Sequence, residues 1–203
     1  MNVDQILINE KVTCKVHPRN SYLMDTAQLI QQGNTHYEAR RYQEAVAAYT
    51  DAIRIDPTNR FAYCGIGCAL FALGRYRDAL NAFGEALQLN ANDAFVYRSI
   101  GDILSECKRY QEALRAYARA IRLSPSSGHT YNNLGVLLEE MQRYEEAVRS
   151  YAQAIQLEPG QALYYYNLGK ALENLGKSEQ AEQAYKKAQQ LGSPEMPEDA
   201  FLN

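Results

Sequence analysis

Two helical stripes of apolar and small residues alternate along the chain, and the pair recurs every 34 residues from residue 26 onward. Apolar or small residues stand at positions 4, 7, 8 and 11 of a unit and again at 17, 20, 24, 27 and 28. Each set is the spacing of one helical face. Gly or polar residues separate the stripes near position 15, and Pro at position 32 ends three of the units. The pattern predicts a hairpin of two helices in every unit.

The smallest residues keep the same register in all five units, without one insertion. Gly occupies position 8 in the form of Gly33, Gly67, Gly101, Gly135 and Gly169. Position 20 is always Ala, and an aromatic ring stands at position 24, namely Tyr49, Phe83, Tyr117, Tyr151 and Tyr185. The small residues allow the two helices to approach closely, and the ring fills the space beside them. Because one hairpin cannot bury its own stripes, neighbouring hairpins are expected to stack.

These residue types at these positions resemble the tetratricopeptide repeat (TPR) family, whose repeat is 34 residues long. The resemblance covers residues 26–195 and implies an all-α fold, a right-handed superhelical solenoid of helix-turn-helix hairpins. It divides the chain into an N-terminal extension and possible cap (residues 1–25), five repeats (26–59, 60–93, 94–127, 128–161 and 162–195) and a flexible acidic tail (196–203).

Both ends of the array carry polar residues where internal units carry apolar ones. Positions 21 and 28 of the second helix are apolar in the first four units but become Glu182 and Gln189 in the fifth. The first helix of the first unit is polar in the same way, with Gln28 and Gln32. We expect both faces to meet water or a small cap, as solubility of a repeat array requires. Residues 1–20 are either that cap or a flexible arm.

Composition and charge narrow the class of protein. The formal net charge of −3 and the pI of about 5.7 provide no long-range attraction to nucleic acid. No stretch approaches the roughly 20 apolar residues of a membrane helix, and the first residues do not form a signal peptide. Four Cys are too few for a disulfide framework in a chain of this length. We expect a cytoplasmic protein, monomeric or weakly self-associating, that binds neither nucleic acid nor membrane.

In the resembling family, one stripe of each first helix lines a concave groove, and along this stripe the five units differ. The first half is apolar, with Ile30, Tyr37, Phe61, Cys64, Cys68, Phe71 and Phe95. The second half is polar, with Arg98, Asn132, Asn133, Tyr166, Asn167 and Lys170 as candidate binding residues, Ser99, Asp102 and His129 on the same stripe, and Glu139, Glu140 and Glu173 at its edge. This gradient suits an extended or helical partner segment whose apolar side chains dock at one end and whose backbone is held at the other. The alternative is that the Phe rings cover neighbouring helices.

Asn133 and Asn167 both occupy position 6 in the same Asn-Leu-Gly context. An Asn amide offers donors and an acceptor that match a peptide bond, so the pair is expected to hold the backbone of a bound peptide. The arrangement is similar to the asparagine ladder of the TPR superhelix in protein O-glycosyltransferases, with two rungs only. The alternative is that the two amides pack between repeats.

Catalytic and cofactor chemistry find little support in the residues. No nucleophile, base and orienting group form a recognisable signature, and His17, His36 and His129 lie in separate units. Cys64 and Cys68 stand one turn apart and could bind a soft metal or sense oxidants, but further ligands are missing. The simpler interpretation is a pair of small apolar groove residues. We expect no enzyme activity, no metal and no cofactor.

One basic stripe falls outside the groove. Arg115, Arg119 and Arg122 follow one another on the second helix of the third unit, on the expected convex face. A solvated surface explains such a stripe in most proteins. The alternative is a second docking surface for an acidic partner.

The sequence therefore predicts a non-catalytic interaction module, an adaptor, scaffold or assembly factor that binds a protein or peptide segment in its concave groove. The sequence is also compatible with two other functions. The chain could be a structural scaffold that self-associates, for example by seating Phe201 and Leu202 of its own tail in the apolar groove. It could also be the regulatory subunit of a catalytic partner.

Overall fold

The computed structural model describes residues 25–192, and these residues form helices joined by short turns. In chain order the helices are α1 (Thr26–Glu38), α2 (Tyr42–Ile55), α3 (Arg60–Ala72), α4 (Tyr76–Leu89), α5 (Ala94–Glu106), α6 (Tyr110–Leu123), α7 (Gly128–Glu140), α8 (Tyr144–Leu157), α9 (Ala162–Asn174) and α10 (Ser178–Gln190). No strand occurs between residues 25 and 192. The expected all-α solenoid of hairpins is confirmed.

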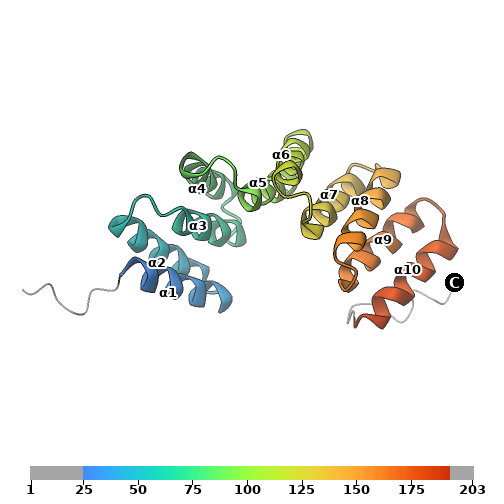
Figure 1. The fold of residues 1–203 in the computed structure, drawn as a ribbon, viewed down its shortest axis with the longest axis horizontal. Coiled ribbons are helices and arrows are strands. Elements are labelled where there is room, and N and C mark those ends of the chain that lie inside the picture. Colours follow the sequence, from blue (N-terminus) through green and yellow to red (C-terminus); the bar gives the residue numbers. More distant parts are fainter. Residues whose placement is uncertain (1–24, 193–203) are drawn as a thin grey trace, which may run out of the picture.

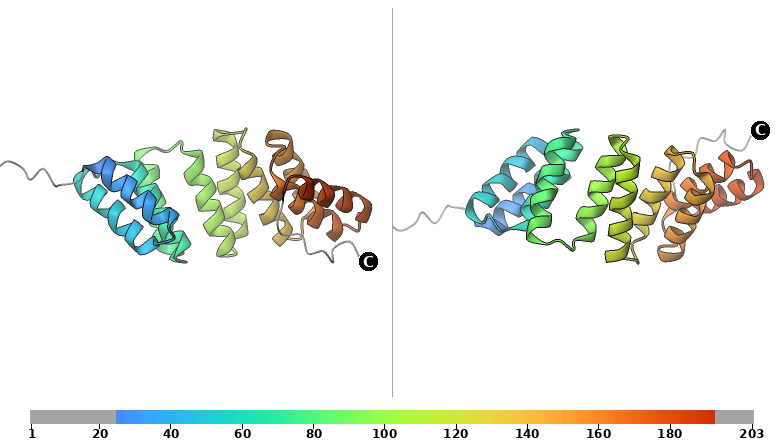
Figure 2. Two further views of the ribbon diagram at one scale, coloured as in Figure 1. Left: turned by 90° about the horizontal axis from the view of Figure 1, so that it is seen from below. Right: turned by 90° about the horizontal axis from the view of Figure 1, so that it is seen from above.

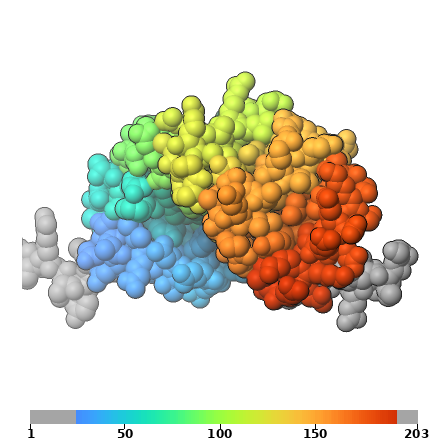
Figure 3. All heavy atoms as spheres, turned by 45° about the vertical axis from the view of Figure 1, so that its right-hand side comes forward, coloured from blue at the N-terminus to red at the C-terminus, as the bar shows by residue number. Residues whose placement is uncertain are grey.

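Consecutive helices pair as antiparallel hairpins that follow one another along an arch (Figure 1). The side views in Figure 2 show the hairpins stacked along the long axis of the molecule. Each odd-numbered helix contacts the next odd-numbered helix, whereas the even-numbered helices make no comparably extensive contact with one another. The odd-numbered helices therefore line the inner, concave side. In the space-filling view of Figure 3 the repeats form one continuous curved body.

Local sequence signals start four of the five odd-numbered helices of the described residues, α1, α3, α5 and α7. The side chains of Asp25, Asn59, Asp93 and Ser127 accept hydrogen bonds from backbone N–H groups of the first turn. At Asp25 the cap is reciprocal, because the Gln28 side chain accepts from the Asp25 N–H. Such caps satisfy N–H groups that have no partner within the helix. They place the first turn of these four helices at the same point of the repeat, whereas Gln161 before α9 makes no such bond.

In each repeat the aromatic ring at position 24 packs directly against the Gly at position 8. A methyl group added at Gly135 would come within 2.5 Å of the Tyr151 ring, and one added at Gly67 within 2.8 Å of the Phe83 ring. Both rings are fully buried. The ring thus occupies the volume that a side chain at position 8 would need, which explains the constant pairing of Gly with an aromatic residue.

The two ends of the array are polar on the surface. Glu182 and Gln189 are both exposed, whereas the corresponding Val148 and Ile155 of the fourth repeat are half-buried. Gln28 and Gln32 of α1 are likewise exposed. The predicted cap or arm at residues 1–20 and the predicted flexible tail lie outside the described residues. Within residues 25–192, no helix is long and apolar enough to cross a membrane.

Candidate functional site

The apolar half of the concave face presents aromatic rings to solvent. Phe61 on α3 is 60% exposed, Phe95 on α5 is 43% exposed and Tyr37 on α1 is 37% exposed. A large part of each ring is therefore open to solvent. The guanidinium carbon of Arg60 lies 4.1 Å from the Phe61 ring centre, and that of Arg98 lies 5.1 Å from the Phe95 ring centre. A cation over a ring face is attracted by the ring quadrupole, which orients both side chains.

Four other predicted residues of the apolar half contribute to the core as well as to the groove. Ile30 packs against the first core cluster, and Cys64, Cys68 and Phe71 pack against the second. All four are half-buried. The apolar half is therefore a half-buried floor with exposed rings beside it.

The two Cys thiols of this floor are poor ligands. Burial raises the pKa of Cys64 to about 12 and that of Cys68 to about 11. The thiolate is the form that binds metals and reacts, so both groups stay protonated at neutral pH. Among residues 25–192 no three His, Cys, Asp or Glu side chains gather as a metal site would require.

Buried hydroxyl groups hold the carboxylates of the second half of the concave face in place. The Tyr117 hydroxyl donates to Asp102 at 2.7 Å, and the Tyr151 hydroxyl donates to Glu139 at 3.1 Å. The position 24 Tyr ring, which packs between the two helices of the hairpin, thus carries a hydroxyl that reaches the groove. Burial raises the pKa of Asp102, against the opposing effect of its hydrogen bonds.

Lysine and arginine side chains of the groove face these carboxylates. Lys170 on α9 lies 3.2 Å from Glu139, and Arg98 on α5 lies 3.8 Å from Asp102. Tyr166 is half-buried beside Tyr185, with ring centres 5.7 Å apart. Most of the predicted polar residues are therefore already bound to other groups of the chain.

The predicted asparagine ladder also has partners within the chain. Asn167 is 9% exposed and donates to the side-chain oxygen of Asn132, which is 5% exposed, at 2.9 Å. Asn133 donates to Asp102 at 2.8 Å. In both cases the Asn at position 6 bonds to a residue of the preceding repeat, because neighbouring inner helices are close enough for their side chains to meet. The amides thus have the inter-repeat partners of the alternative interpretation, and their binding to a peptide stays a prediction.

Two adjoining hollows open along the polar half of the concave face. One, of about 260 Å³, lies between Phe71 on α3 and residues of α5 and α7. The other, of about 320 Å³, lies between α7 and α9. The charged residues that line them are Asp102, Glu106, Glu139 and Glu140, with Lys170 as the cation. The two hollows thus carry four carboxylates against one ammonium, and with Arg98 beside Asp102 counted as a second cation the charge of this half is still net negative.

Sequence reasoning underrated the carboxylates. Asp102, Glu139 and Glu140 fall on or beside the groove stripe, but the predicted site set does not include them. Tyr117 and Tyr151 are predicted as packing residues, and they also donate to these carboxylates. The available signal is the pairing of a position 24 Tyr with an acid at position 9 or 12 of the same repeat.

A curved stack of helical hairpins with a lined concave face defines a class of binding scaffolds, and sequence comparison gives its family. Models for the TPR repeat match residues 33–74 and 139–176, and tetratricopeptide repeat models match residues 64–128 and 162–191. The chain therefore belongs to the tetratricopeptide repeat family. Members of this family are protein–protein interaction modules that bind protein or peptide partners and are generally not catalytic.

Solved structures show the same fold. MamA is 25% identical with a TM-score of 0.67, and the match covers 78% of this chain and 93% of MamA. YrrB, a TPR protein with an unusual peptide-binding site, is 23% identical with a TM-score of 0.61, over 83% of this chain and 87% of its own. PilF of Pseudomonas aeruginosa is 22% identical with a TM-score of 0.76, over 84% and 78% respectively.

Proposed function

We propose that the concave face holds a segment of a partner protein. One part of the segment places aromatic or aliphatic side chains against Phe61 and Phe95. Another part places Lys or Arg side chains in the acidic hollows beside α7. The chain then acts as an adaptor, scaffold or assembly factor, with selectivity from the rings and orientation from the charges.

The observation that carries the proposal is the pair of exposed Phe rings on two successive inner helices, at 60% and 43% exposure. Aromatic side chains and Arg dominate the energetics of protein interfaces, and an Arg stacks on each ring here. Clustered exposed apolar side chains mark contact sites. Family membership supports the binding of a protein or peptide segment, and YrrB, a protein of the same fold, has a peptide-binding site.

The sign of the charge supports a basic partner segment. The hollows carry Asp102, Glu106, Glu139 and Glu140 against Lys170 alone. Complementary charge mainly accelerates association and selects the partner, because surface pairs are screened by salt. A segment rich in Glu or Asp would meet repulsion at this half of the groove.

A random peptide library displayed on phage tests the proposal. Selected peptides are expected to combine aromatic or aliphatic residues with Lys or Arg. Replacing Phe61 and Phe95 together with Ser should weaken the binding of a selected peptide by roughly 1–3 kcal/mol in calorimetry.

The matched control is Ile55→Ser, because Ile55 is 55% exposed but ends the outer helix α2. This substitution should leave the affinity unchanged. Peptides that bind equally well to the double Ser variant would show that the concave rings are not the contact surface.

A further inference from the structure

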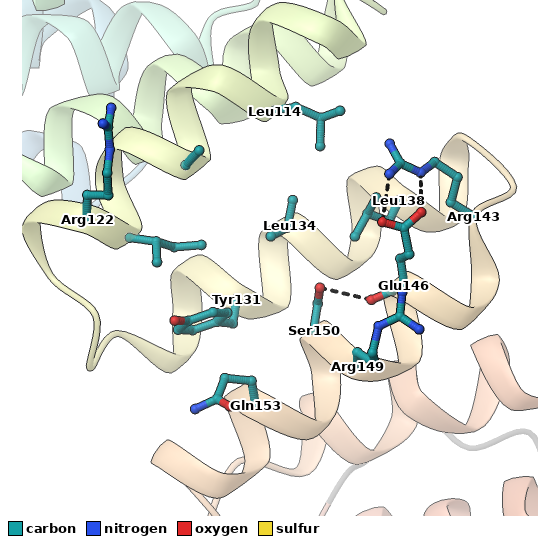
Figure 4. Close-up of a pocket in the computed structure, with 12 residues that line it drawn as sticks. Leu114, Arg122, Tyr131, Leu134, Leu138, Arg143, Glu146, Arg149, Ser150 and Gln153 are labelled. Atoms are coloured by element: carbon teal, nitrogen blue, oxygen red, sulfur yellow. Dashed lines mark hydrogen bonds and ion pairs between the residues drawn. The ribbon is translucent and has the colours of Figure 1, made fainter.

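A larger hollow lies on the opposite, outer side of the molecule, between α6 and α8 and over α7. Its volume is about 580 Å³, within the range of cavities that accept ligands in proteins. Figure 4 shows side chains from all three helices arranged around it. None of its lining residues belongs to the hollows of the concave face.

The floor of this outer cleft is apolar. It is formed by Leu114, Ala118 and Ile121 of α6 and by Tyr131, Leu134 and Leu138 of α7. In the first two repeats the residues equivalent to Ile121 are Ile53 and Leu87, and both pack against a core cluster. Here α6 contacts α7 much less extensively than α2 contacts α3 or α8 contacts α9, and α4 contacts α5 to a similarly small extent. Leu114 and Leu134 pack against core clusters but are only half-buried, so part of each side chain borders the cleft.

The rim of the outer cleft is positively charged. Arg122, Arg143 and Arg149 line it together with one acid, Glu146. Glu146 is already held by Arg143, through two hydrogen bonds of 2.6 and 2.7 Å. Arg122 and Arg149 are exposed, and neither has a carboxylate within 4.0 Å among residues 25–192. Two guanidinium groups are thus available to a ligand, in a chain whose net charge is −3.

The pair of arginines occurs at this junction alone in the sequence. Arg122 is at position 29 of the third repeat, and Arg149 is at position 22 of the fourth. The same two positions at the other three junctions read Arg54 with Asn81, Gln88 with Arg115, and Gln156 with Gln183. The only other Arg at position 29, Arg54, is paired with Asp51 at 2.7 Å. Two junctions are loosely packed, α4 with α5 and α6 with α7, and only the second has Arg at both positions.

We infer that the outer cleft between α6 and α8 docks an acidic amphipathic segment of a partner protein. Its apolar side chains fill the floor over Leu134, and carboxylates on either side of them pair with Arg122 and Arg149. Arg forms paired, charge-assisted hydrogen bonds with a carboxylate, and an apolar strip flanked by charges is the pattern of a helix docked in a groove. Of the basic stripe predicted on α6, Arg122 belongs to this site. Arg119 instead bonds to Asn92 at 3.0 Å.

The test uses the full-length chain and a fluorescent synthetic peptide of about twelve residues, with leucines along one helical face and glutamates on both sides of that stripe. Binding is measured by fluorescence anisotropy at low and at physiological salt. The peptide is expected to bind, and to bind more weakly as salt rises, because salt screens the exposed ion pairs. Arg122→Gln with Arg149→Gln should weaken binding at least about tenfold.

Two further variants separate the site from general charge and from folding. Arg54→Gln with Arg115→Gln removes the same charge at the same repeat positions of other junctions, and it should leave binding unchanged. Ala118→Phe fills the cleft from an exposed position of α6 and should abolish binding while the circular dichroism spectrum is retained. A peptide with Gln in place of every Glu should bind at least about tenfold more weakly than the acidic one.

Two results would overturn the inference. One is equal affinity of the acidic peptide for the wild-type chain and for the Arg122→Gln, Arg149→Gln variant. The other concerns competition by a synthetic peptide of residues 193–203. If this peptide displaces the fluorescent peptide at a lower concentration than the unlabelled acidic peptide does, the cleft belongs to the chain's own acidic tail. A peptide selected for the concave face should not compete, because the two faces are opposite in position and in charge.

Discussion

At the scale of single residues, Asp102 combines a structural and an electrostatic role. One oxygen of its carboxylate accepts from both the Tyr117 hydroxyl, at 2.7 Å, and the Asn133 amide, at 2.8 Å. Burial raises the pKa of Asp102 above its ordinary value of 3.8. Because the folded-state pKa lies above the unfolded one, proton binding favours the folded chain. The associated stabilisation is complete below about pH 4 and is lost as pH rises through the folded-state pKa.

Two substitutions of Asp102 separate charge from hydrogen bonding. Asp102→Asn keeps a side-chain oxygen for both donors and removes the buried charge, so it should cancel this residue's contribution to the pH dependence of stability. Asp102→Ala removes the acceptor of the buried Tyr117 hydroxyl and of the half-buried Asn133 amide, and it should cost roughly 1–3 kcal/mol. Urea denaturation at pH 4 and pH 7 measures both effects. Equal destabilisation by Asn and Ala at pH 7 would mean that the charged carboxylate is required.

At the scale of elements, the turn inside each hairpin depends on one residue with left-handed backbone. This residue is at position 15 in every repeat, with φ of 59° at Arg40, 71° at Gly74, 57° at Lys108, 59° at Gln142 and 70° at Gly176. Gly adopts this conformation without strain, whereas other L-residues do so at a cost. The turn geometry is thus common to all repeats, and two of them have the residue that fits it best.

Ala substitutions at Gly74 and Gly84 test this account, since a methyl group at either residue would meet nothing within 4 Å. Gly74→Ala should destabilise the chain by about 1 kcal/mol, because Ala resists positive φ. Gly84→Ala should stabilise it by about 0.5–1 kcal/mol, because Gly84 lies inside α4, where Ala is the better helix former. Chemical denaturation of the two variants is the measurement. Effects of the same sign would contradict the role given to the backbone.

At the scale of the whole molecule, the C-terminal face of α10 limits the length of the stack. Glu182 and Gln189 are exposed at the two positions through which other repeats contact the next one. Glu182 also pairs with Lys186 at 2.6 Å. Replacing Glu182 and Gln189 with Leu recreates an apolar stacking face and should promote self-association, seen as a concentration-dependent rise in mass by sedimentation.

The matched control replaces Glu179 and Gln183 with Leu. These residues stand at positions 18 and 22, which are exposed in all five repeats. The control adds the same apolar side chains away from the stacking face and should stay monomeric. A strictly monomeric Glu182→Leu, Gln189→Leu variant at high concentration would contradict the assignment of these positions to the stacking face.

Much of the fold follows from the sequence because its determinants are local. The 34-residue period places each helix, and Gly at position 8 with a ring at position 24 specifies how the two helices of a hairpin pack, since both lie within one unit. The sequence also predicts the polar end face, because Glu182 and Gln189 replace residues that are apolar in every earlier unit. These features need no knowledge of how one repeat is placed on the next.

Only the tertiary structure decided what happens between repeats. The pairing of Asn167 with Asn132 and of Asn133 with Asp102 depends on how closely neighbouring inner helices approach. The cleft that brings Arg122 near Arg149 depends on the wider placement of α6 against α7 and α8. All four junctions have apolar contact residues of similar type, so their hydrophobic pattern does not distinguish the two loosely packed junctions from the two closely packed ones. The physical reason is that inter-repeat spacing results from the summed packing of three helices, whereas helical periodicity reports one helix at a time.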